Sequence, residues 1–522
     1  MIILQEGRGV NRGRAKKVYK IMIRFGGEMR EAEACSGETL LAVLQRAGIP
    51  VPAPCGGQGR CGKCRVLLQK DGAEQTVLAC RAKADGDCAV TLETQHGGAI
   101  VGAAGMGPAV RSGRTGLGAA LDLGTTTAVL ELFDLHSGES RGLSAQWSAL
   151  AAYGADVISR AQYCMEHEGG AATLRALLRD QTADLLRQLG ARPQDLKELF
   201  VAGNTVMQHL YAGLDPSPIA RAPFIPPTLF TDGPLEPGLR YSPCVAGYVG
   251  GDITAGLLAS GLADEGGRHL FLDIGTNGEM ALGGRDGFLC CAVASGPAFE
   301  GAGIACGMPG LPGAVSRVRW TEDAPEYEVI GGGEAKGLCG SGLIDLLAVL
   351  CEKRLITGGG LLLGPEDAPA EYARFLGEDE RGNGVFYLTE DRRVFLTASD
   401  VRQLQLAKAA VAAGIRVLLK KSGLAAEDIA SLSLAGGFGN YLNVESAVQI
   451  GMLPPVLQGK CRVLGNTSLA GARLALLDPA ARESLSAIQR ACRYIELSGD
   501  ADFNLEYTEQ LYFYEEEDEE WN

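Results

Sequence analysis

Hydrophobic and polar positions along the N-terminal part of the chain follow two periods. Residues Tyr19 to Phe25 alternate as a strand does, and Glu38 to Ala47 places Leu40, Leu41 and Leu44 on one face of a helix. Two shorter apolar runs, at 66–68 and 77–79, predict further strands. This pattern predicts a small α+β module at the N-terminus.

The rest of the chain contains an internal repeat. The segment LDLGTTT (121–127) recurs as LDIGTNG (272–278), and each copy lies between two strand-like runs, which predicts a tight hairpin. The segment GARPQDLKELFVAG (190–203) aligns without a gap with GLAAEDIASLSLAG (423–436), and each follows an amphipathic helix. Two halves with the order hairpin, helix, strand and glycine turn indicate an ancient duplication.

The 522 residues are enough for several domains. A basic extension precedes Val18, and a glycine-rich stretch separates the N-terminal module from the repeat. We predict a module at 18–95, a linker at 96–117, a first lobe at 118–265, a second lobe at 266–510 and an acidic tail at 511–522.

Composition and charge exclude several classes of protein. The net charge of −15 argues against nucleic acid as a partner, because phosphate binding needs a basic surface. The most apolar stretch, Leu338–Leu350, is interrupted by small and acidic residues, so no membrane partner is expected, and the first twenty residues lack the apolar segment of a signal peptide. Fifteen cysteines then fit a reducing cytoplasm, where clustered cysteines suggest metal binding.

Four cysteines form a constellation with the spacing C-x5-C-x2-C-x15-C: Cys55, Cys61, Cys64 and Cys80. Three ligands on one loop and a fourth further on is close to the plant-type ferredoxin arrangement. Glycines at 56, 57, 59 and 62 supply the backbone freedom that wrapping a cluster requires. We predict one [2Fe–2S] cluster in a β-grasp ferredoxin; a zinc site is the alternative, although only one C-x2-C pair is present.

The repeated hairpins suit a nucleotide. An Asp at the end of a strand, followed by Gly and Thr, presents a carboxylate to Mg²⁺ and backbone amides and hydroxyls to phosphate. Asp122 and Asp273 are therefore expected to organise Mg²⁺. Phosphate contacts are expected from Thr125, Thr126, Thr276 and Asn277. Close approach of adenosine is expected at Gly436, Gly437 and Gly439. Asp252 either orients the attacking water or caps a helix. Walker A and dinucleotide fingerprints are absent.

These motifs resemble a known superfamily. DLGTTT and DIGTNGE look like the two phosphate motifs of the acetate and sugar kinase, Hsp70 and actin superfamily, and AGGFG (435–439) looks like its adenosine motif. The resemblance implies a duplicated α/β actin-like (ribonuclease H-like) ATPase fold. It also implies nucleotide contacts at Gly124, Thr127, Gly275, Gly278 and Glu279.

The fusion of CGGQGRCGKC (55–64) to this ATPase resembles a narrower family, the reductive activators of corrinoid proteins. Four further segments resemble the ATPase portion of that family: VAGNTVMQHL (201–210), YVGGDITAG (248–256), SGPAFEGAGI (295–304) and LCGSGLIDLL (338–347). It implies ATP-dependent transfer of single electrons to the Co(II) corrinoid of a partner protein or methyltransferase. It also implies a low-potential electron donor and leaves a homodimer open.

One further expectation concerns a loop, and two alternative functions remain open. The segment from Ser295 to Glu300 is expected to be an accessible, partner-facing loop, and a plain structural turn is the alternative. A small-molecule kinase with a fused ferredoxin is a second function, and an ATP-switched redox sensor is a third.

Overall fold

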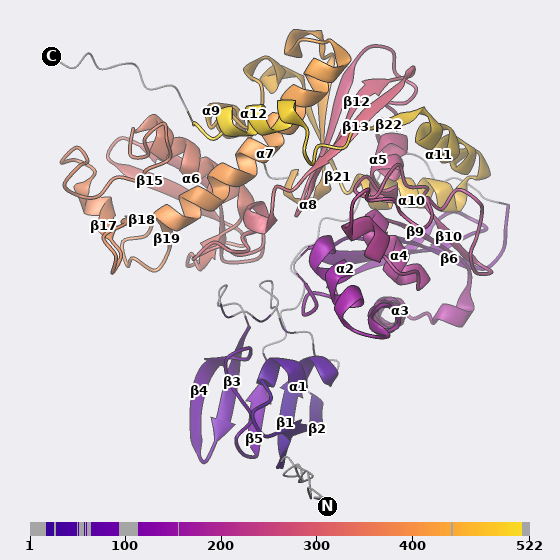
Figure 1. Cartoon of the computed structure of the whole chain (residues 1–522), viewed down its shortest axis with the longest axis horizontal. Coiled ribbons are helices and arrows are strands. Elements are labelled where there is room, and N and C mark those ends of the chain that lie inside the picture. Colours follow the sequence, from indigo (N-terminus) through magenta and orange to yellow (C-terminus); the bar gives the residue numbers. More distant parts are fainter. Residues whose placement is uncertain are drawn as a thin grey trace, which may run out of the picture. The chain divides into compact units, whose positions relative to one another are not determined.

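The computed structural model describes residues 17–25, 28–47, 49, 51, 57, 59, 64–92, 113–154, 156–439 and 442–513 (Figure 1). The chain divides into two compact units, Met1–Gln95 and His96–Asn522. The basic extension, most of the linker and the acidic end of the tail lie outside the described residues.

The first unit is a five-stranded sheet with one helix, in the order β2-β1-β5-β3-β4. Its elements are β1 (Val18–Phe25), β2 (Glu28–Cys35), α1 (Leu40–Arg46), β3 (Arg65–Lys70), β4 (Ala73–Leu78) and β5 (Cys88–Thr91). Strands β1 and β5 run parallel, and the other pairings of these strands are antiparallel. The β-grasp fold is confirmed, with the strand and helix expected near residues 19–25 and 38–47.

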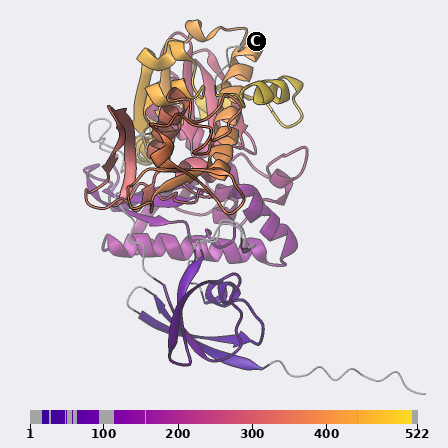
Figure 2. The same ribbon diagram turned by 90° about the vertical axis from the view of Figure 1, so that its left-hand side faces the viewer.

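The core of the first unit lies between the sheet and α1. Ile21 and Ile23 of β1 are buried, as is Leu44 of α1, and the strands curve around the helix (Figure 2). The Thr39 hydroxyl begins α1 by accepting a hydrogen bond from the Ala42 amide at 3.3 Å. Two-residue alternation along the strands therefore fixes which side chains face α1.

The second unit contains two sheets of the same design (Figure 1). One has the order β10-β9-β6-β7-β8, and the other has β21-β20-β11-β12-β13-β22. In each, a hairpin-forming first strand pairs in parallel with the strand that follows the long helix. Both hairpins expected from the repeat are confirmed, and the α/β fold with them.

The first lobe and its boundaries are β6 (Leu117–Leu123), β7 (Thr127–Asp134), β8 (Ser140–Trp147), α2 (Val157–Glu166), α3 (Gly170–Gln188), β9 (Leu196–Gly203), α4 (Thr205–Ala212), β10 (Leu239–Tyr241) and α5 (Gly251–Ser260). The remaining elements are β11 (His269–Ile274), β12 (Gly278–Gly284), β13 (Gly287–Val293), β14 (Ala314–Thr321), β15 (Ala324–Val329), β16 (Gly337–Leu338), α6 (Gly340–Glu352), β17 (Leu376–Glu378), β18 (Gly384–Tyr387), β19 (Phe395–Thr397), α7 (Ala398–Ser422), β20 (Ser431–Ala435), α8 (Gly436–Gly439), α9 (Val444–Gln449), β21 (Cys461–Gly465), α10 (Thr467–Leu477), α11 (Pro479–Ala491), β22 (Cys492–Tyr494) and α12 (Ala501–Glu509).

The repeated segments adopt the same local structure in both lobes. Gly190 and Gly423 end the long helices α3 and α7 with φ of 73° and 65°, a region that favours glycine. Five residues later, Asp195 and Asp428 each accept a hydrogen bond from the amide three residues earlier, at 2.9 and 2.8 Å. These contacts explain why the two sequences align without a gap.

Helix α10, late in the sequence, lies against the first lobe. It contacts β6, β9 and α5, and its Leu469 and Leu476 are buried with Ala120 of β6. A Cβ on Gly471 would lie 2.1 Å from the Ala255 carbonyl oxygen, so α10 and α5 approach each other closely. The sequence boundary at 265/266 therefore separates α10 from the sheet that it covers.

Candidate nucleotide and cluster sites

Each hairpin places an Asp at the carboxyl end of the first strand of its lobe. The carboxylate of Asp122, on β6, accepts hydrogen bonds from Asn466 Nδ2 at 2.8 Å and Ser468 Oγ at 2.7 Å. Asp273 occupies the corresponding place on β11, and within the described part of the chain no side chain donates to it. The two predicted Mg²⁺ residues therefore have different surroundings.

Five carboxylates influence one another around these strand ends: Asp122, Asp252, Asp273, Glu279 and Glu300. Burial, together with Asp252 and Asp122, raises the pKa of Asp273 to about 8. Burial raises the pKa of Asp252 as well, and Asp122 adds to the rise. The pKa values of Asp122, Glu279 and Glu300 are raised, with burial again the largest cause. Burial therefore disfavours the ionised form of these carboxyls, and once ionised they would carry more negative charge than the neighbouring side chains neutralise.

This surplus charge fits a magnesium nucleotide. Among the described residues, no group of three His, Cys, Asp or Glu side chains is arranged to hold a metal ion alone. Mg²⁺ usually keeps several waters and takes one or two carboxylates together with phosphate oxygens. The acids near Asp122 and Asp273 therefore suit Mg²⁺ that arrives with a triphosphate.

Residues of the two phosphate motifs face each other. Thr126 Oγ1 and Thr276 Oγ1 are 3.3 Å apart, and Asn277 Nδ2 donates to Glu279 Oε1 at 3.2 Å. A Cβ on Gly124 would lie 2.7 Å from the Thr127 carbonyl oxygen, which explains the glycine in this turn.

The remaining predicted phosphate residues lie in the same two turns with fewer contacts. The Gly275 amide donates to the Asn277 carbonyl at 2.8 Å, which closes the second turn. Gly278 begins β12. No side-chain hydrogen bond joins Thr125 or Thr127 to the second motif within the described ranges.

The predicted adenosine motif, expected as a glycine turn, forms one turn of helix, α8. Gly436 has φ of 84°, and a Cβ there would lie 2.4 Å from Asp273 Oδ1. At Gly437 a Cβ would have no neighbour within 4 Å. Gly436 therefore lets the backbone pass beside the carboxylate, while Gly437 leaves open space of the kind that a close adenosine needs. Gly439 ends α8.

Residue Asp252 is the second residue of α5, whose N-cap is Gly250. The alternative in which Asp252 caps the helix is therefore wrong. Its carboxylate lies among the acids described above, as its pKa shows.

Two of the four cysteines predicted to hold the cluster are described. Cys64 Sγ and Cys80 Sγ lie 3.2 Å apart, and both residues are buried. The Ala79 amide donates to the Cys64 carbonyl at 2.7 Å, which aligns the two ligand segments. Cys55 and Cys61 lie outside the described residues.

Two described glycines before Cys64 have a backbone conformation that fits a wrapped cluster. Gly57 and Gly59 have φ of 81° and 73°. A Cβ on Gly59 would lie 2.4 Å from Arg81 Nε, and Arg81 Nη2 donates to the Gly59 carbonyl at 3.1 Å. Paired buried thiols beside such a loop are the donor set that an iron–sulfur cluster takes.

Comparison with known families covers most of the chain. Residues 23–85 match the 2Fe-2S iron-sulfur cluster binding domain, residues 117–265 match the RACo middle region, and residues 268–522 match the C-terminal domain of RACo, the ASKHA domain. The [2Fe–2S] domain and the ATPase fold are thereby confirmed.

Individual relatives point to the same family as these domain matches. The chain is 34% identical over 408 residues to the corrinoid activation enzyme RamQ of Eubacterium limosum, covering 74% of this chain and 68% of RamQ. It is 28% identical to the [Co(II) methylated amine-specific corrinoid protein] reductase of Methanosarcina barkeri, over 45% of this chain and 44% of that protein. A solved reductive activator for corrinoid,iron-sulfur protein superposes with a TM-score of 0.69 at 31% identity, covering 95% of this chain and 98% of that one. The chain belongs to the family of reductive activators of corrinoid proteins.

One expectation about this family member is wrong for Ser295, while the partner-facing role of the segment stays a prediction. Ser295 and Glu300 were expected on an accessible loop, but Ser295 is 5% exposed and its hydroxyl donates to the Gly275 carbonyl at 3.3 Å. Glu300 accepts hydrogen bonds from Thr126 and Thr276. The Gly-Pro turn between them folds toward the phosphate motifs because these polar partners lie there.

Four residues of the activator's site were not singled out by the sequence: Arg160, Asn204, Asn466 and Ser468. Arg160 is buried, and its Nη2 donates to the Thr125 carbonyl at 2.7 Å. Asn204 Nδ2 approaches Glu279 Oε1 at 3.4 Å. Asn204 follows Gly203 at the position equivalent to Gly437, which was a usable signal; Arg160, Asn466 and Ser468 carry no local pattern.

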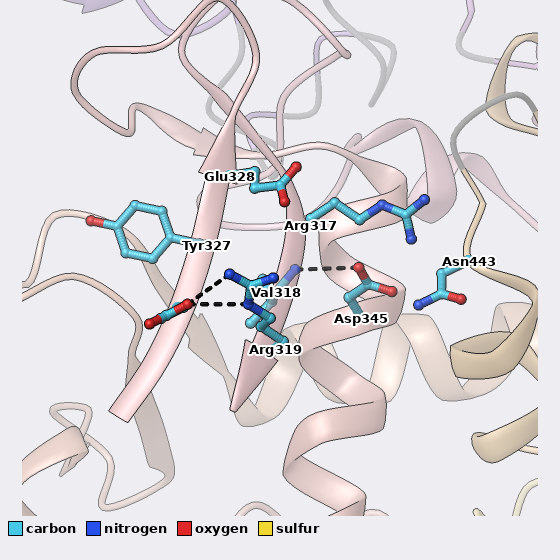
Figure 3. A pocket seen from close by; sticks show the side chains of 8 residues that line it. Arg317, Val318, Arg319, Tyr327, Glu328, Asp345 and Asn443 are labelled. Atoms are coloured by element: carbon cyan, nitrogen blue, oxygen red, sulfur yellow. Dashed lines mark hydrogen bonds and ion pairs between the residues drawn. The ribbon is translucent and has the colours of Figure 1, made fainter. Parts of the chain in front are cut away.

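A cavity of about 250 Å³ lies between β14, β15, α6 and the start of α9 (Figure 3). Asp345 on its wall accepts hydrogen bonds from Ser446 Oγ at 2.7 Å and the Val318 amide at 3.2 Å, and burial raises its pKa. Arg319 on the opposite strand pairs with Glu326 at 2.9 Å. These contacts join α6 to α9, so we assign Asp345 a structural role in the family member.

No helix in the described ranges combines the length and apolarity that crossing a membrane requires.

Proposed function

We propose that this chain is an ATP-dependent reductive activator that passes single electrons from its [2Fe–2S] cluster to the Co(II) corrinoid of a partner corrinoid protein or methyltransferase. Each electron converts one Co(II) to Co(I), and ATP is hydrolysed to ADP and phosphate. One observation carries the proposal: a single chain joins the buried Cys64–Cys80 pair of a ferredoxin module to two facing Asp hairpins. The names of its relatives give the acceptor.

The residue roles form part of the proposal. Asp122 and Asp273 organise Mg²⁺, and Asp252 orients the attacking water. Thr125, Thr126, Thr276 and Asn277 bind phosphate oxygens, with Gly124, Thr127, Gly275, Gly278 and Glu279 completing the two turns. Gly436, Gly437 and Gly439 approach adenosine, and Cys55, Cys61, Cys64 and Cys80 hold the cluster.

A [2Fe–2S] cluster supplies one-electron chemistry when it is bound. The chain's own contribution is to couple that chemistry to nucleotide state. A nucleotide can favour electron transfer only if the states of the protein bind Co(II) and Co(I) partners differently. Thr126 of one lobe and Thr276 of the other can both reach one phosphate, so closing the lobes around ATP is the step that we assign to these residues.

The setting of the reaction is also proposed. We place the protein in the cytoplasm with a low-potential electron donor and without a membrane partner. Its net charge of −15 argues against nucleic acid as a partner. The lobe and linker boundaries at 95/96, 117/118, 265/266 and 510/511 remain part of this proposal.

The decisive experiment is anaerobic. The reduced full chain should transfer electrons to a Co(II) corrinoid protein faster with Mg²⁺–ATP than without it, measured by absorbance at the Co(I) band, and the ferredoxin module alone should be much slower. Equal rates with and without ATP across several corrinoid partners would remove the activator function. Rapid turnover with a small acid or sugar would instead support the kinase.

The cluster has its own test. Cys64→Ser should weaken or distort the electron paramagnetic resonance signal of the reduced protein, while Cys461→Ser, outside the ferredoxin module, should leave it unchanged. An intact spectrum and iron content in the Cys64 variant would contradict the assignment.

A further inference from the structure

Glu300 joins the two phosphate motifs through one oxygen. Its Oε2 accepts a hydrogen bond from Thr126 Oγ1 at 2.7 Å and from Thr276 Oγ1 at 3.1 Å. Thr126 follows β6 of the first lobe, and Thr276 follows β11 of the second. The carboxylate therefore holds the two hydroxyls that we assign to phosphate.

A carboxylate and a phosphate compete for these hydroxyls. Each threonine hydroxyl has one proton to donate, and an ionised carboxylate or phosphate can only accept. A phosphate oxygen that takes the proton of Thr126 or Thr276 must therefore replace Glu300 Oε2. Two negative groups at this distance also repel each other, which favours departure of the carboxylate.

The positive charge of Arg160 strengthens this competition. The charge of Arg160 acts on Glu300 and lowers its pKa against the larger effect of burial. Arg160 is itself buried, with Nη2 on the Thr125 carbonyl and Nη1 beside Met207 Sδ at 3.0 Å. When Glu300 leaves, the positive charge of Arg160 remains beside the phosphate motif.

The backbone around Glu300 can transmit its movement. Glu300 ends a short 3-10 helix, Pro297–Glu300, between Gly296 and Gly301, whose φ values are 72° and 77°. Phe299 is buried in the core and holds the helix, so we expect the change to run through Gly301 toward the following residues.

That following segment is tied to a long helix. The Ala305 amide donates to Asp400 Oδ1 at 2.8 Å, and Asp400 forms the capping box that begins α7 with Thr397. On the other side, Ser295 Oγ donates to the carbonyls of Gly275 and Thr276 at 3.3 and 3.4 Å. Residues 295–305 are therefore bonded to the phosphate motif at one end and to α7 at the other.

We infer that Glu300 is a nucleotide-sensing latch: it occupies the phosphate site by binding Thr126 and Thr276 when no nucleotide is present, and its displacement by phosphate rearranges residues 300–305. The inference rests on the proposed function for the identity of the ligand. Glu300 is in this sense a positioning residue that acts through the segment it belongs to.

The test compares nucleotide affinities. Glu300→Gln keeps the shape and removes the charge, and Glu334→Gln, an exposed acid of the same lobe, is the control. Calorimetry with Mg²⁺ and a non-hydrolysable ATP analogue should show roughly five- to thirty-fold tighter binding by Glu300→Gln, a change worth one or two kcal/mol. Adenosine, which brings no phosphate, should bind both variants and the parent chain alike.

Opposite results would overturn the latch. Weaker binding of the ATP analogue by Glu300→Gln would make Glu300 a group that supports the nucleotide, and an equal change for adenosine would make it merely structural. Glu300→Asp, whose shorter side chain keeps the charge, should bind the analogue with intermediate affinity if the Gln variant does not fold.

A second measurement follows the segment itself. Hydrogen exchange of peptides covering residues 295–305 should change when the parent chain binds the ATP analogue, and should change much less in Glu300→Gln. No change in the parent chain would overturn the proposed transmission even if the affinities behave as expected. Binding and exchange are both measured without a corrinoid partner, so their failure is distinguishable from failure of corrinoid reduction.

Discussion

The two halves of the second unit share one design, but they fill their strand ends differently. In the first half, two donors hold Asp122, and Asn204 extends its side chain to Glu279. In the second half, no described side chain donates to Asp273, and Gly437, at the position of Asn204, faces open space. The strand end of the first half is filled by side chains, two of them from the start of α10, whereas that of the second half has left room for a ligand.

This difference teaches how a duplicated fold comes to serve a single nucleotide. Two identical halves would offer two equal carboxylates and two equal glycine turns. In this chain one half has an asparagine where the other has a glycine, and described side chains donate to only one of the two Asp residues. One adenosine position therefore remains, together with one carboxylate that lacks such a donor. Four tests break or sharpen this comparison.

The largest effect is expected for Asp273→Asn. Losing this charge next to Mg²⁺ should cost about 1.5–3 kcal/mol of nucleotide binding or transition-state stabilisation, seen as a fall in phosphate release. Thermal unfolding of the nucleotide-free protein should occur at the same or a higher temperature, because a charge that is costly to bury has been removed. Unchanged ATPase activity would sink the assignment of Asp273.

The matched change in the first half, Asp122→Asn, should act mainly on folding. An amide would present its NH₂ to Asn466 or Ser468, both of which already donate. The free energy of unfolding should fall by about 1–3 kcal/mol, measured by urea titration. Equal stability losses for the Asp122 and Asp273 variants would remove the contrast between the halves.

Two neighbouring glycines give the third comparison. Gly436→Ala should lower the free energy of unfolding by about 1–2 kcal/mol, since its φ is positive and its Cβ would meet Asp273. Gly437→Ala should change stability by no more than about 0.5 kcal/mol, yet weaken adenosine binding in calorimetry. Tight adenosine binding by the Gly437 variant would show that the open space does not hold the nucleoside.

The smallest effect concerns Lys408 on α7, which the repeat offset aligns with Arg175 on α3. Arg175 is partly exposed and pairs with Glu236 at 2.6 Å, whereas Lys408 is buried and donates to the Tyr512 carbonyl at 2.5 Å. Burial lowers the pKa of Lys408 to about 8, from 10.5.

The lowered pKa of Lys408 sets the direction in which stability changes with pH. Between pH 8 and 10.5 the unfolded chain binds more protons at this lysine than the folded one, so stability should rise with pH across this window. Lys408→Met should abolish this contribution, and Arg175→Met should not, as measured by urea unfolding at pH 8 and pH 10. A rise that persists in Lys408→Met would assign the effect to another group.

The sequence was most informative where chemistry is local. Three features depend on residues close together in the sequence: the Asp-x-Gly-Thr hairpins, the segments of the gapless repeat and the cysteine loop. The structure contains both the hairpins and the repeat. Asn466 lies 344 positions from Asp122, so no local pattern could join them. The exposure of Ser295 was misjudged for the same reason: a Gly-Pro turn predicts a bend, but only the tertiary fold shows which surface the bend meets.

The return of α10 to the first lobe has a consequence for biosynthesis. The ribosome releases β6 and β9 early, but Leu469 and Leu476, which complete the hydrophobic cover of that sheet, emerge more than two hundred residues later. Until then the apolar face around Ala120 and Phe200 is covered only in part, by Ala255 of α5, which exposes a nascent chain to aggregation. Truncated chains that end before α10 should accordingly depend on chaperones, and a first lobe cut at residue 265 should lose the cover that α10 gives its sheet.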